Sequence, residues 1–177
     1  MSYFSNFPVM LYDPSGDGSA KLTTNILKRV RVRANMKKEL VMLNQYEVLE
    51  NETPEIVADK HHGDPSYHWV ILLLNGIADV NHDWVKSTRQ MQRYMSAKYS
   101  GNQLNEAHHY EVFQTSGDTT IKIEVENASY PSATSVTNYQ YEIALNETKR
   151  KIDLLRNDYL HVFIDEFKNL IWNYNGR

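Results

Sequence analysis

The seven histidines are the residues of this chain whose chemistry would most readily bind a metal ion. Their spacing matches no ligand set, because the H-E-x-x-H pattern is absent and adjacent histidines on one element usually point to different sides. The chain also has no cysteine, which excludes disulfides, thiolate nucleophiles and cysteine–zinc sites. We therefore expect no metal site, and we interpret these residues as surface and corner histidines: His61, His62, His68, His82, His108, His109 and His161.

An acidic motif near the N-terminus could bind calcium. Asp13-x-Ser15-x-Asp17-Gly18 resembles the first half of an EF-hand loop. The twelfth position would be Thr24 instead of a bidentate glutamate, and no helix precedes the motif. We predict a polar turn here.

Acid/base catalysis has little support in the sequence. The G-x-S-x-G, Walker and G-x-G-x-x-G patterns are all absent. We predict that the chain is not an enzyme, binds no cofactor and has no small-molecule substrate. One cluster of acids could supply a general acid/base pair, but we interpret its members as solvated loop residues: Glu47, Glu50, Glu52 and Glu55.

A basic segment covers residues 21–38, which hold 7 of the 19 lysines and arginines and no acid. It could contact phosphates, but no aromatic residue interrupts it for base stacking, and the net charge of the whole chain is -3. The longest apolar run, Val70–Leu74, is far shorter than the roughly 20 residues of a membrane span. We therefore expect neither a nucleic acid nor a membrane as partner.

The N-terminal 20 residues are predicted to form an extended arm. Their apolar residues lack helical spacing, and Pro8 and Pro14 interrupt them. Such an arm is too short to fold alone and must dock on its own domain or on another chain. The N-terminus lacks the basic-then-apolar layout of a signal peptide, so we expect synthesis in a cytosol.

The next 118 residues, 21–138, are predicted to form an α+β domain. Thr53-Pro54 and Asp64-Pro65 are typical of helix starts, and Gly63 and Gly76 of helix ends, so we expect a pair of helices over 54–62 and 65–75. A strand over 46–48 precedes the pair, and a helix over 87–99 follows it. A hairpin is then expected from strands at 110–114 and 120–126, and residues 130–138 are interpreted as a linker.

One long amphipathic helix is predicted between about Glu142 and Trp172, within a C-terminal segment covering 139–177. Its apolar stripe follows helical spacing and is longer than a small domain needs to cover one face. Because an exposed stripe of this length favours aggregation, a partner or the chain's own core must cover it. The stripe consists of Ile152, Leu155, Tyr159, Phe163, Phe167 and Leu170.

Residues 46–63, Tyr-Glu-Val-Leu-Glu-Asn-Glu-Thr-Pro-Glu-Ile-Val-Ala-Asp-Lys-His-His-Gly, resemble the start of a LysM module. The resemblance implies a βααβ fold, whose second strand we expect at Tyr110–Gln114 after an insertion. It also implies an alternative function, peptidoglycan binding between about Leu49–Thr53 and Asn75–Val80. The second of these loops, with Ile77, Asp79 and Val80, carries no clear aromatic residue for stacking on a sugar.

A second resemblance covers most of the chain. The segments 53–60, 63–65, 69–75 and 83–84, with Phe-Pro-Val-Met-Leu-Tyr-Asp at 7–13 and residues 146–156, resemble the baseplate wedge protein 53 family of T4-like contractile-tailed bacteriophages. The chain departs from the family pattern at Ala78-Asp79-Val80, where an Asp-Pro would be expected. The resemblance implies a structural virion protein of the inner tail baseplate, assembled in the host bacterial cytoplasm. It further implies contacts with wedge core proteins, the sheath-initiator protein and neighbouring wedges, which it helps to join into a six-fold ring.

Partner contacts are expected on the arm, near the helical pair and along the C-terminal stripe, because tyrosine, tryptophan and phenylalanine are common at interfaces. The predicted contact residues are Phe4, Phe7, Leu11, Tyr12, Tyr67, Trp84, Ile152, Leu155, Tyr159, Phe163 and Phe167.

Overall fold

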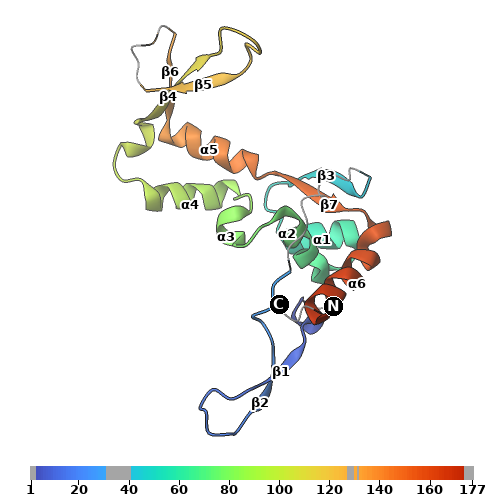
Figure 1. Ribbon diagram of the computed structural model, residues 1–177. Coiled ribbons are helices and arrows are strands. Elements are labelled where there is room, and N and C mark those ends of the chain that lie inside the picture. The colour runs from blue at the N-terminus through green and yellow to red at the C-terminus, as the bar shows by residue number, and fades with distance from the viewer. Residues whose placement is uncertain (1–2, 31–40, 127–129, 131, 174–177) are drawn as a thin grey trace. The chain divides into compact units, whose positions relative to one another are not determined.

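The computed structural model describes residues 3–30, 41–126, 130 and 132–173 (Figure 1). The chain is a mixed α+β protein, as predicted, and divides into two compact units. Unit 1 comprises residues 1–83 and 151–177, and unit 2 comprises residues 84–150. The predicted segments 1–20, 21–138 and 139–177 follow changes in composition along the sequence, and that division stays a prediction.

Unit 1 begins with a 3₁₀ turn and a β-hairpin and ends with the longest helix that the structure describes. A two-stranded sheet, three short α-helices and a second 3₁₀ turn lie between them in the sequence. Its elements are η1 (Tyr3–Asn6), β1 (Val9–Tyr12), β2 (Lys21–Thr24), β3 (Leu43–Glu47), α1 (Pro54–His62), η3 (Pro65–Tyr67), α2 (His68–Asn75), α3 (Val80–Asp83), β7 (Lys151–Leu155) and α6 (Asn157–Asn173).

The predicted helical pair is confirmed together with its capping residues. The Thr53 hydroxyl accepts a hydrogen bond from the Ile56 N–H, and the Asp64 carboxylate accepts one from the Ser66 N–H at 2.8 Å. Gly63 ends α1 with a φ of 75°, a left-handed conformation that glycine adopts without strain. These are local signals, so sequence reasoning located α1 and the end of α2. The predicted second helix begins as the 3₁₀ turn η3, and α2 itself starts three residues later, at His68.

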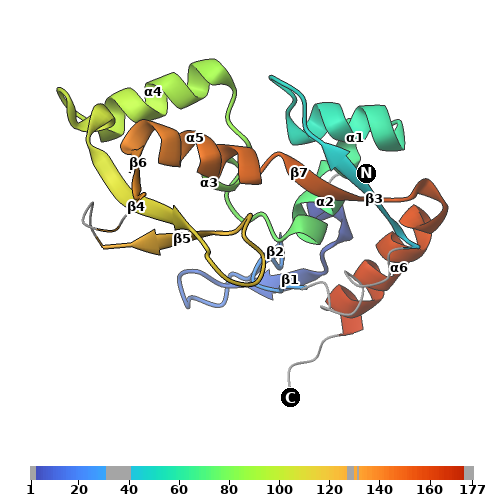
Figure 2. The ribbon, with the colours of Figure 1, turned by 90° about the horizontal axis from the view of Figure 1, so that it is seen from above.

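The strand that completes this unit is β7, and the prediction of Tyr110–Gln114 was wrong. β7 pairs antiparallel with β3, from Leu43 opposite Leu155 to Glu47 opposite Lys151. Figures 1 and 2 show the two strands side by side. Chain order is therefore β3–α1–α2–β7, with all of unit 2 inserted between α2 and β7.

The prediction of one continuous helix from Glu142 to Trp172 was also wrong. Helix α5 (Asn138–Thr148) ends before Lys151, where β7 begins, and α6 starts only at Asn157. In β7, the buried Ile152 and Leu154 alternate with the more exposed Lys151 and Asp153, which suits a strand, and Leu155 at its end is also buried. Pairing with β3 gives backbone N–H and C=O groups of β7 the hydrogen-bond partners that they would otherwise find within a helix.

The core of unit 1 forms where η1, α2, β7 and α6 pack together. The rings of Trp69 on α2 and Phe167 on α6 pack in a tilted arrangement, with centroids 4.8 Å apart. The buried members of this cluster are Phe7, Trp69, Val70, Leu74, Leu155, Leu160, Phe163, Ile164, Phe167 and Ile171.

An asparagine ties α2 to the outer edge of β7. The Asn75 side chain donates to the Asp153 carbonyl at 2.8 Å and accepts from the Asp153 N–H at 2.9 Å. Since these backbone groups of Asp153 bind Asn75, they face away from β3. The Asn75 side chain thus supplies hydrogen-bond partners for the Asp153 backbone, which would otherwise be unpaired at the edge of β7.

Unit 2 contains the predicted helix and hairpin. Helix α4 (Thr88–Lys98) buries Met91 and Met95 and lies beside α5 in both views (Figures 1 and 2). The other elements are η4 (Gln103–Asn105) and an antiparallel sheet in the order β5-β4-β6, made of β4 (Ala107–Phe113), β5 (Lys122–Val125) and β6 (Thr134–Thr137). The predicted linker over 130–138 was wrong in part, because β6 forms there and the Thr137 side chain caps α5.

None of the helices in the described part of the chain combines the length and apolar character that a membrane crossing requires.

Candidate partner-binding surfaces

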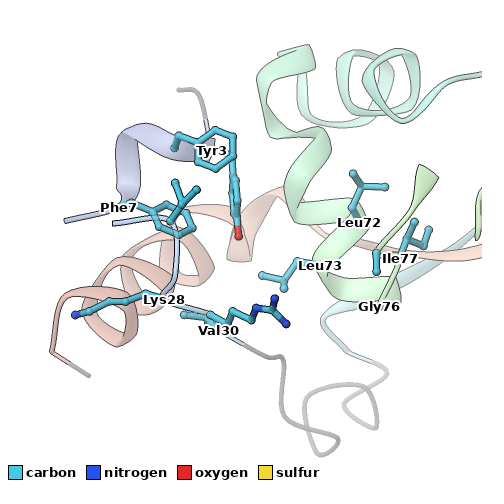
Figure 3. Close-up of a pocket in the computed structure, with 12 residues that line it drawn as sticks. Tyr3, Phe7, Lys28, Val30, Leu72, Leu73, Gly76 and Ile77 are labelled. Atoms are coloured by element: carbon cyan, nitrogen blue, oxygen red, sulfur yellow. The ribbon is translucent and has the colours of Figure 1, made fainter. Parts of the chain in front are cut away.

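An open, mostly apolar groove lies on unit 1 and has a volume of about 650 Å³. In Figure 3, Leu73 lies between Tyr3 and Phe7 on one side and Leu72 and Ile77 on the other. A smaller hollow of about 380 Å³ shares much of this lining. The groove is lined by Tyr3, Phe4, Phe7, Ile26, Lys28, Arg29, Val30, Leu72, Leu73, Gly76, Ile77 and Ala78.

The N-terminal wall of the groove is fixed by contacts within unit 1. The Tyr3 ring lies 4.9 Å from Phe7 and 5.5 Å from Trp69, and Phe7 is buried. The Trp172 indole N–H donates to the Asn6 carbonyl at 3.0 Å. Burial also raises the pKa of the Tyr3 hydroxyl. The start of the predicted arm therefore docks on its own domain as a 3₁₀ turn, and the groove wall exists before any partner binds.

Basic side chains border the groove at its other wall. Lys28 donates to the carbonyls of Ile171 at 2.9 Å and Trp172 at 3.4 Å, so its charge lies at the C-terminal end of α6, where a cation is favoured. Arg29 is exposed. The groove combines apolar walls with a basic border, which suits an apolar side chain presented beside acidic residues.

The second surface is the hairpin formed by β1 and β2, which lie in the predicted extended arm and in the basic segment that follows it. Leu11 lies directly opposite Leu22, and Val9 lies on the same face two residues before Leu11. These three side chains are 66%, 68% and 58% exposed, respectively. At the tip, the Asp13 carboxylate accepts hydrogen bonds from backbone N–H groups, which confirms the predicted polar turn.

The eleven predicted contact residues divide by exposure, and the structure does not bring them together into one patch. Phe4, Leu11 and Tyr12 are exposed, while Tyr67 and Tyr159 are half-buried. The other six are buried within the chain, where they serve its own packing: Phe7, Trp84, Ile152, Leu155, Phe163 and Phe167. As partner contacts, all eleven stay a prediction.

Sequence reasoning missed several residues of these surfaces. Leu72 and Leu73 were predicted only as members of the second helix, and Ile77 as part of the loop that follows it, yet all three line the groove. Leu22 and Ile26 are exposed apolar residues of the basic segment, which was interpreted from its charges alone. Apolar residues inside a highly charged segment were the signal that could have found them.

One of the clustered glutamates is buried, which corrects its interpretation as a solvated loop residue. Glu52 is 7% exposed and accepts hydrogen bonds from the Tyr46 hydroxyl, the Leu49 N–H and the Lys60 ammonium. Burial opposes ionisation, but these hydrogen bonds outweigh it and hold the pKa of Glu52 below its usual value. The carboxylate fixes the turn between β3 and α1.

The histidines on α1 connect it to the start of α6. His61 Nε2 lies 3.0 Å from the Leu155 carbonyl oxygen, and His62 Nδ1 lies 2.7 Å from Asn157 Oδ1. Burial lowers the pKa of His62, which favours its neutral form. Among the described residues, the structure contains no cluster of three side chains suited to hold a metal ion.

A family model described as base plate wedge protein 53 matches residues 16–128. The chain belongs to this family. It is therefore a baseplate wedge protein of a bacteriophage tail, and the family places it in the virion among other baseplate proteins. The match includes β2, β3, α1 and α2, whereas β7 and α6 lie outside it. Comparison with curated proteins finds no match.

Proposed function

We propose that this chain joins neighbouring wedges into the six-fold ring of the inner baseplate through protein–protein contacts. Its partners are wedge core proteins, the sheath-initiator protein and neighbouring wedges, and assembly takes place in the host cytoplasm. The observation that carries the proposal is the groove of unit 1, a hollow that mostly apolar residues line beside the core of the described part of the unit. Open apolar surface on a folded protein marks an interaction site.

The groove is suited to a protein partner. Its walls are fixed by Phe7 and Trp69 in the core below, so binding does not have to order them first. Phe4 and Ile26 are 56% and 64% exposed and offer apolar area that a partner can bury. Burial of such side chains is favourable to association, by less than the roughly 1.5–3 kcal/mol of a fully exposed side chain that becomes fully buried.

We further propose that β3, α1, α2 and β7 form a LysM-like module that serves as the scaffold for this contact. The chain order and the antiparallel pairing of β3 with β7 support that reading. Peptidoglycan binding, the alternative suggested by the LysM resemblance, has no support from the family match.

The test replaces two exposed groove residues with acids, as Phe4→Asp with Ile26→Asp, and measures the yield of complete baseplates by electron microscopy. We expect at least a tenfold loss, because removing apolar contacts from an interface typically costs about 2 kcal/mol or more. The matched control is Val162→Asp on α6, which is 64% exposed and lies outside the groove lining. Normal yield from the double variant would refute the role of the groove, provided that both variants melt like the wild type.

A further inference from the structure

The last two residues of α1 hold the point where β7 ends and α6 begins. His61 Nε2 lies 3.0 Å from the Leu155 carbonyl oxygen, and the Asn157 amide nitrogen donates to the His61 carbonyl at 2.8 Å. His62 Nδ1 lies 2.7 Å from Asn157 Oδ1. These three hydrogen bonds join residues that are 94 to 96 positions apart in the sequence, and each of them involves one of the two histidines.

The hydrogen bonds of Asn157 assign the proton on the His62 ring. Because the amide nitrogen of Asn157 donates to the His61 carbonyl, its oxygen is the atom that faces His62. An amide oxygen only accepts hydrogen bonds, so Nδ1 of His62 carries the hydrogen, and Nε2 of the neutral ring carries a lone pair. By the same argument, Nε2 of His61 donates to the Leu155 carbonyl. All three hydrogen bonds therefore form with both rings uncharged.

A second proton on His62 would have no acceptor. Nε2 of His62 is buried and has no hydrogen-bond partner among the described residues. A proton on this atom would place an N–H group and a positive charge where nothing accepts them, which is costly. Burial accordingly lowers the pKa of His62; the hydrogen bond with Asn157 raises it, and a charge on His61 lowers it further.

No neighbouring carboxylate offsets this cost. The His62 ring is contacted by η3, through the Tyr67 ring at a centroid distance of 6.2 Å, and by α6, through Asn157. Besides Tyr67, the charged or titratable groups near it on these elements and on α1 are Asp59, Lys60, His61, Asp64, Arg156 and Asp158. Asp158 pairs with Arg156 at 2.9 Å, and no carboxylate in the described part of the chain forms an ion pair with His62. A protonated His62 ring is therefore stabilised only where Nε2 reaches water.

We propose that His61, His62 and Asn157 form an acid-sensitive latch between α1 and the start of α6. The latch is closed while both rings are neutral. In acid, Nε2 of His62 takes a proton from solvent and the ring turns the new N–H toward water, which draws Nδ1 away from Asn157 Oδ1. Asn157 is then no longer fixed, so its hydrogen bond to the His61 carbonyl is lost and the first turn of α6 loosens from α1. This inference does not depend on the proposed assembly function.

The direction of the pKa gives the pH range in which the latch opens. The unfolded chain binds a proton at His62 near the ordinary pKa of 6.5, whereas the folded chain binds it only at lower pH. The stability that the latch contributes is therefore complete above pH 6.5 and is lost as the pH falls from 6.5 through the pKa of the folded protein. Over that range, His62 should raise the unfolding equilibrium constant by up to about tenfold per pH unit. Farther along α6, Phe167 packs against Trp69 and neither side chain titrates, so the opening should stay at the start of the helix.

The test follows the histidine ring protons of the full-length wild-type chain by NMR as the pH is lowered from about 8 to about 4. His161 is the internal control, because it lies on α6 and is exposed. We expect His62 to titrate at a lower pH than His161. Hydrogen exchange then reports the opening: the hydrogen-bonded amides of Arg156 and Tyr159 should lose protection by about threefold or more as His62 titrates, while the amide of Phe167 keeps its protection.

A variant separates the titrating ring from the hydrogen bond that it makes. His62→Asn keeps an N–H donor for Asn157 Oδ1 and cannot be protonated. Its urea unfolding should lack the part of the loss of stability below pH 6.5 that His62 causes. The matched control, His161→Asn, should keep the pH dependence of the wild type. Because the NMR titration uses the wild type, the proposal can be tested even if His62→Asn folds poorly.

Three results would overturn the proposal. Titration of His62 at or above the pH at which His161 titrates would show that Nε2 has an acceptor or reaches water in the folded protein. Titration at a lower pH with unchanged protection of Arg156 and Tyr159 would show a buried histidine whose protonation opens nothing. Equal pH dependence of unfolding in His62→Asn and the wild type would show that His62 contributes no acid-sensitive stability.

Discussion

Replacing Phe167 with alanine distinguishes a core residue from a partner contact at the C-terminal stripe. Phe167 is 2% exposed and packs among the rings of Trp69, Tyr3 and Phe7, with centroid distances of 4.8, 5.8 and 6.3 Å. Truncating a buried phenylalanine costs about 3–5 kcal/mol, from lost burial and from the cavity left behind. At about 3 °C per kcal/mol for a chain of this size, the melting temperature should fall by about 10–15 °C.

The assay is thermal unfolding of the isolated, unassembled protein, followed by circular dichroism. Val162→Ala is the matched control, because Val162 lies on the same helix and is 64% exposed, so its effect should stay within about 0.5 kcal/mol. If Phe167→Ala melted like the wild type yet failed to assemble, the stripe would be an interface and the packing described for unit 1 would be refuted.

Two further predictions concern buried polar groups. Glu142 is 2% exposed; burial opposes its ionisation, but hydrogen bonds from Lys98 and Tyr99 outweigh this and lower its pKa below 4.5. The stability that ionised Glu142 contributes should be complete above pH 4.5 and should be lost as the pH falls through the lower pKa of the folded protein. Urea unfolding of Glu142→Gln should lack this loss of stability in acid. An equal loss in Glu142→Gln and in the wild type would contradict the role given to Glu142. Asn75→Ala should lower the free energy of unfolding by about 1–3 kcal/mol, because the N–H and C=O of Asp153 lose their partner; an unchanged urea midpoint would show that water replaces the amide fully.

Sequence reasoning succeeded where the deciding signals are local. Thr53 and Asp64 begin their helices with hydrogen bonds that span two or three residues, and Gly63 ends α1 through its own backbone conformation. A cap contributes about the same wherever the helix packs, so it can be identified without knowing the fold.

The strand β7 shows why the rest of the fold could not be predicted. Ile152 and Leu155 fit helical spacing, while Ile152 and Leu154 fit the alternation of a strand. What decides between them is the pairing with β3, which lies more than 100 residues earlier in the chain. A short apolar run carries no information about such a distant partner.

The groove could not be predicted for a related reason. It is assembled from three separate segments, represented by Tyr3, Val30 and Leu73, and each presents ordinary apolar residues in the sequence. Which of these residues the core buries and which it leaves open depends on how α6 covers α2. Leu74 is 1% exposed, whereas its neighbour Leu73 lies in the groove.

Unit 1 buries one set of apolar residues in its core and leaves another set exposed, and we expect the two sets to affect assembly differently. Within unit 1, the rings of Phe7, Trp69 and Phe167 are covered by the chain itself, so folding does not have to wait for a partner. The groove carries apolar side chains, such as Phe4 and Ile26, that stay exposed in the described part of unit 1. Substitutions in the first set should therefore reduce the amount of folded protein, whereas substitutions in the second should leave its amount unchanged and block its incorporation. We therefore expect a wedge subunit built in this way to accumulate in folded form before a partner covers its exposed apolar surface.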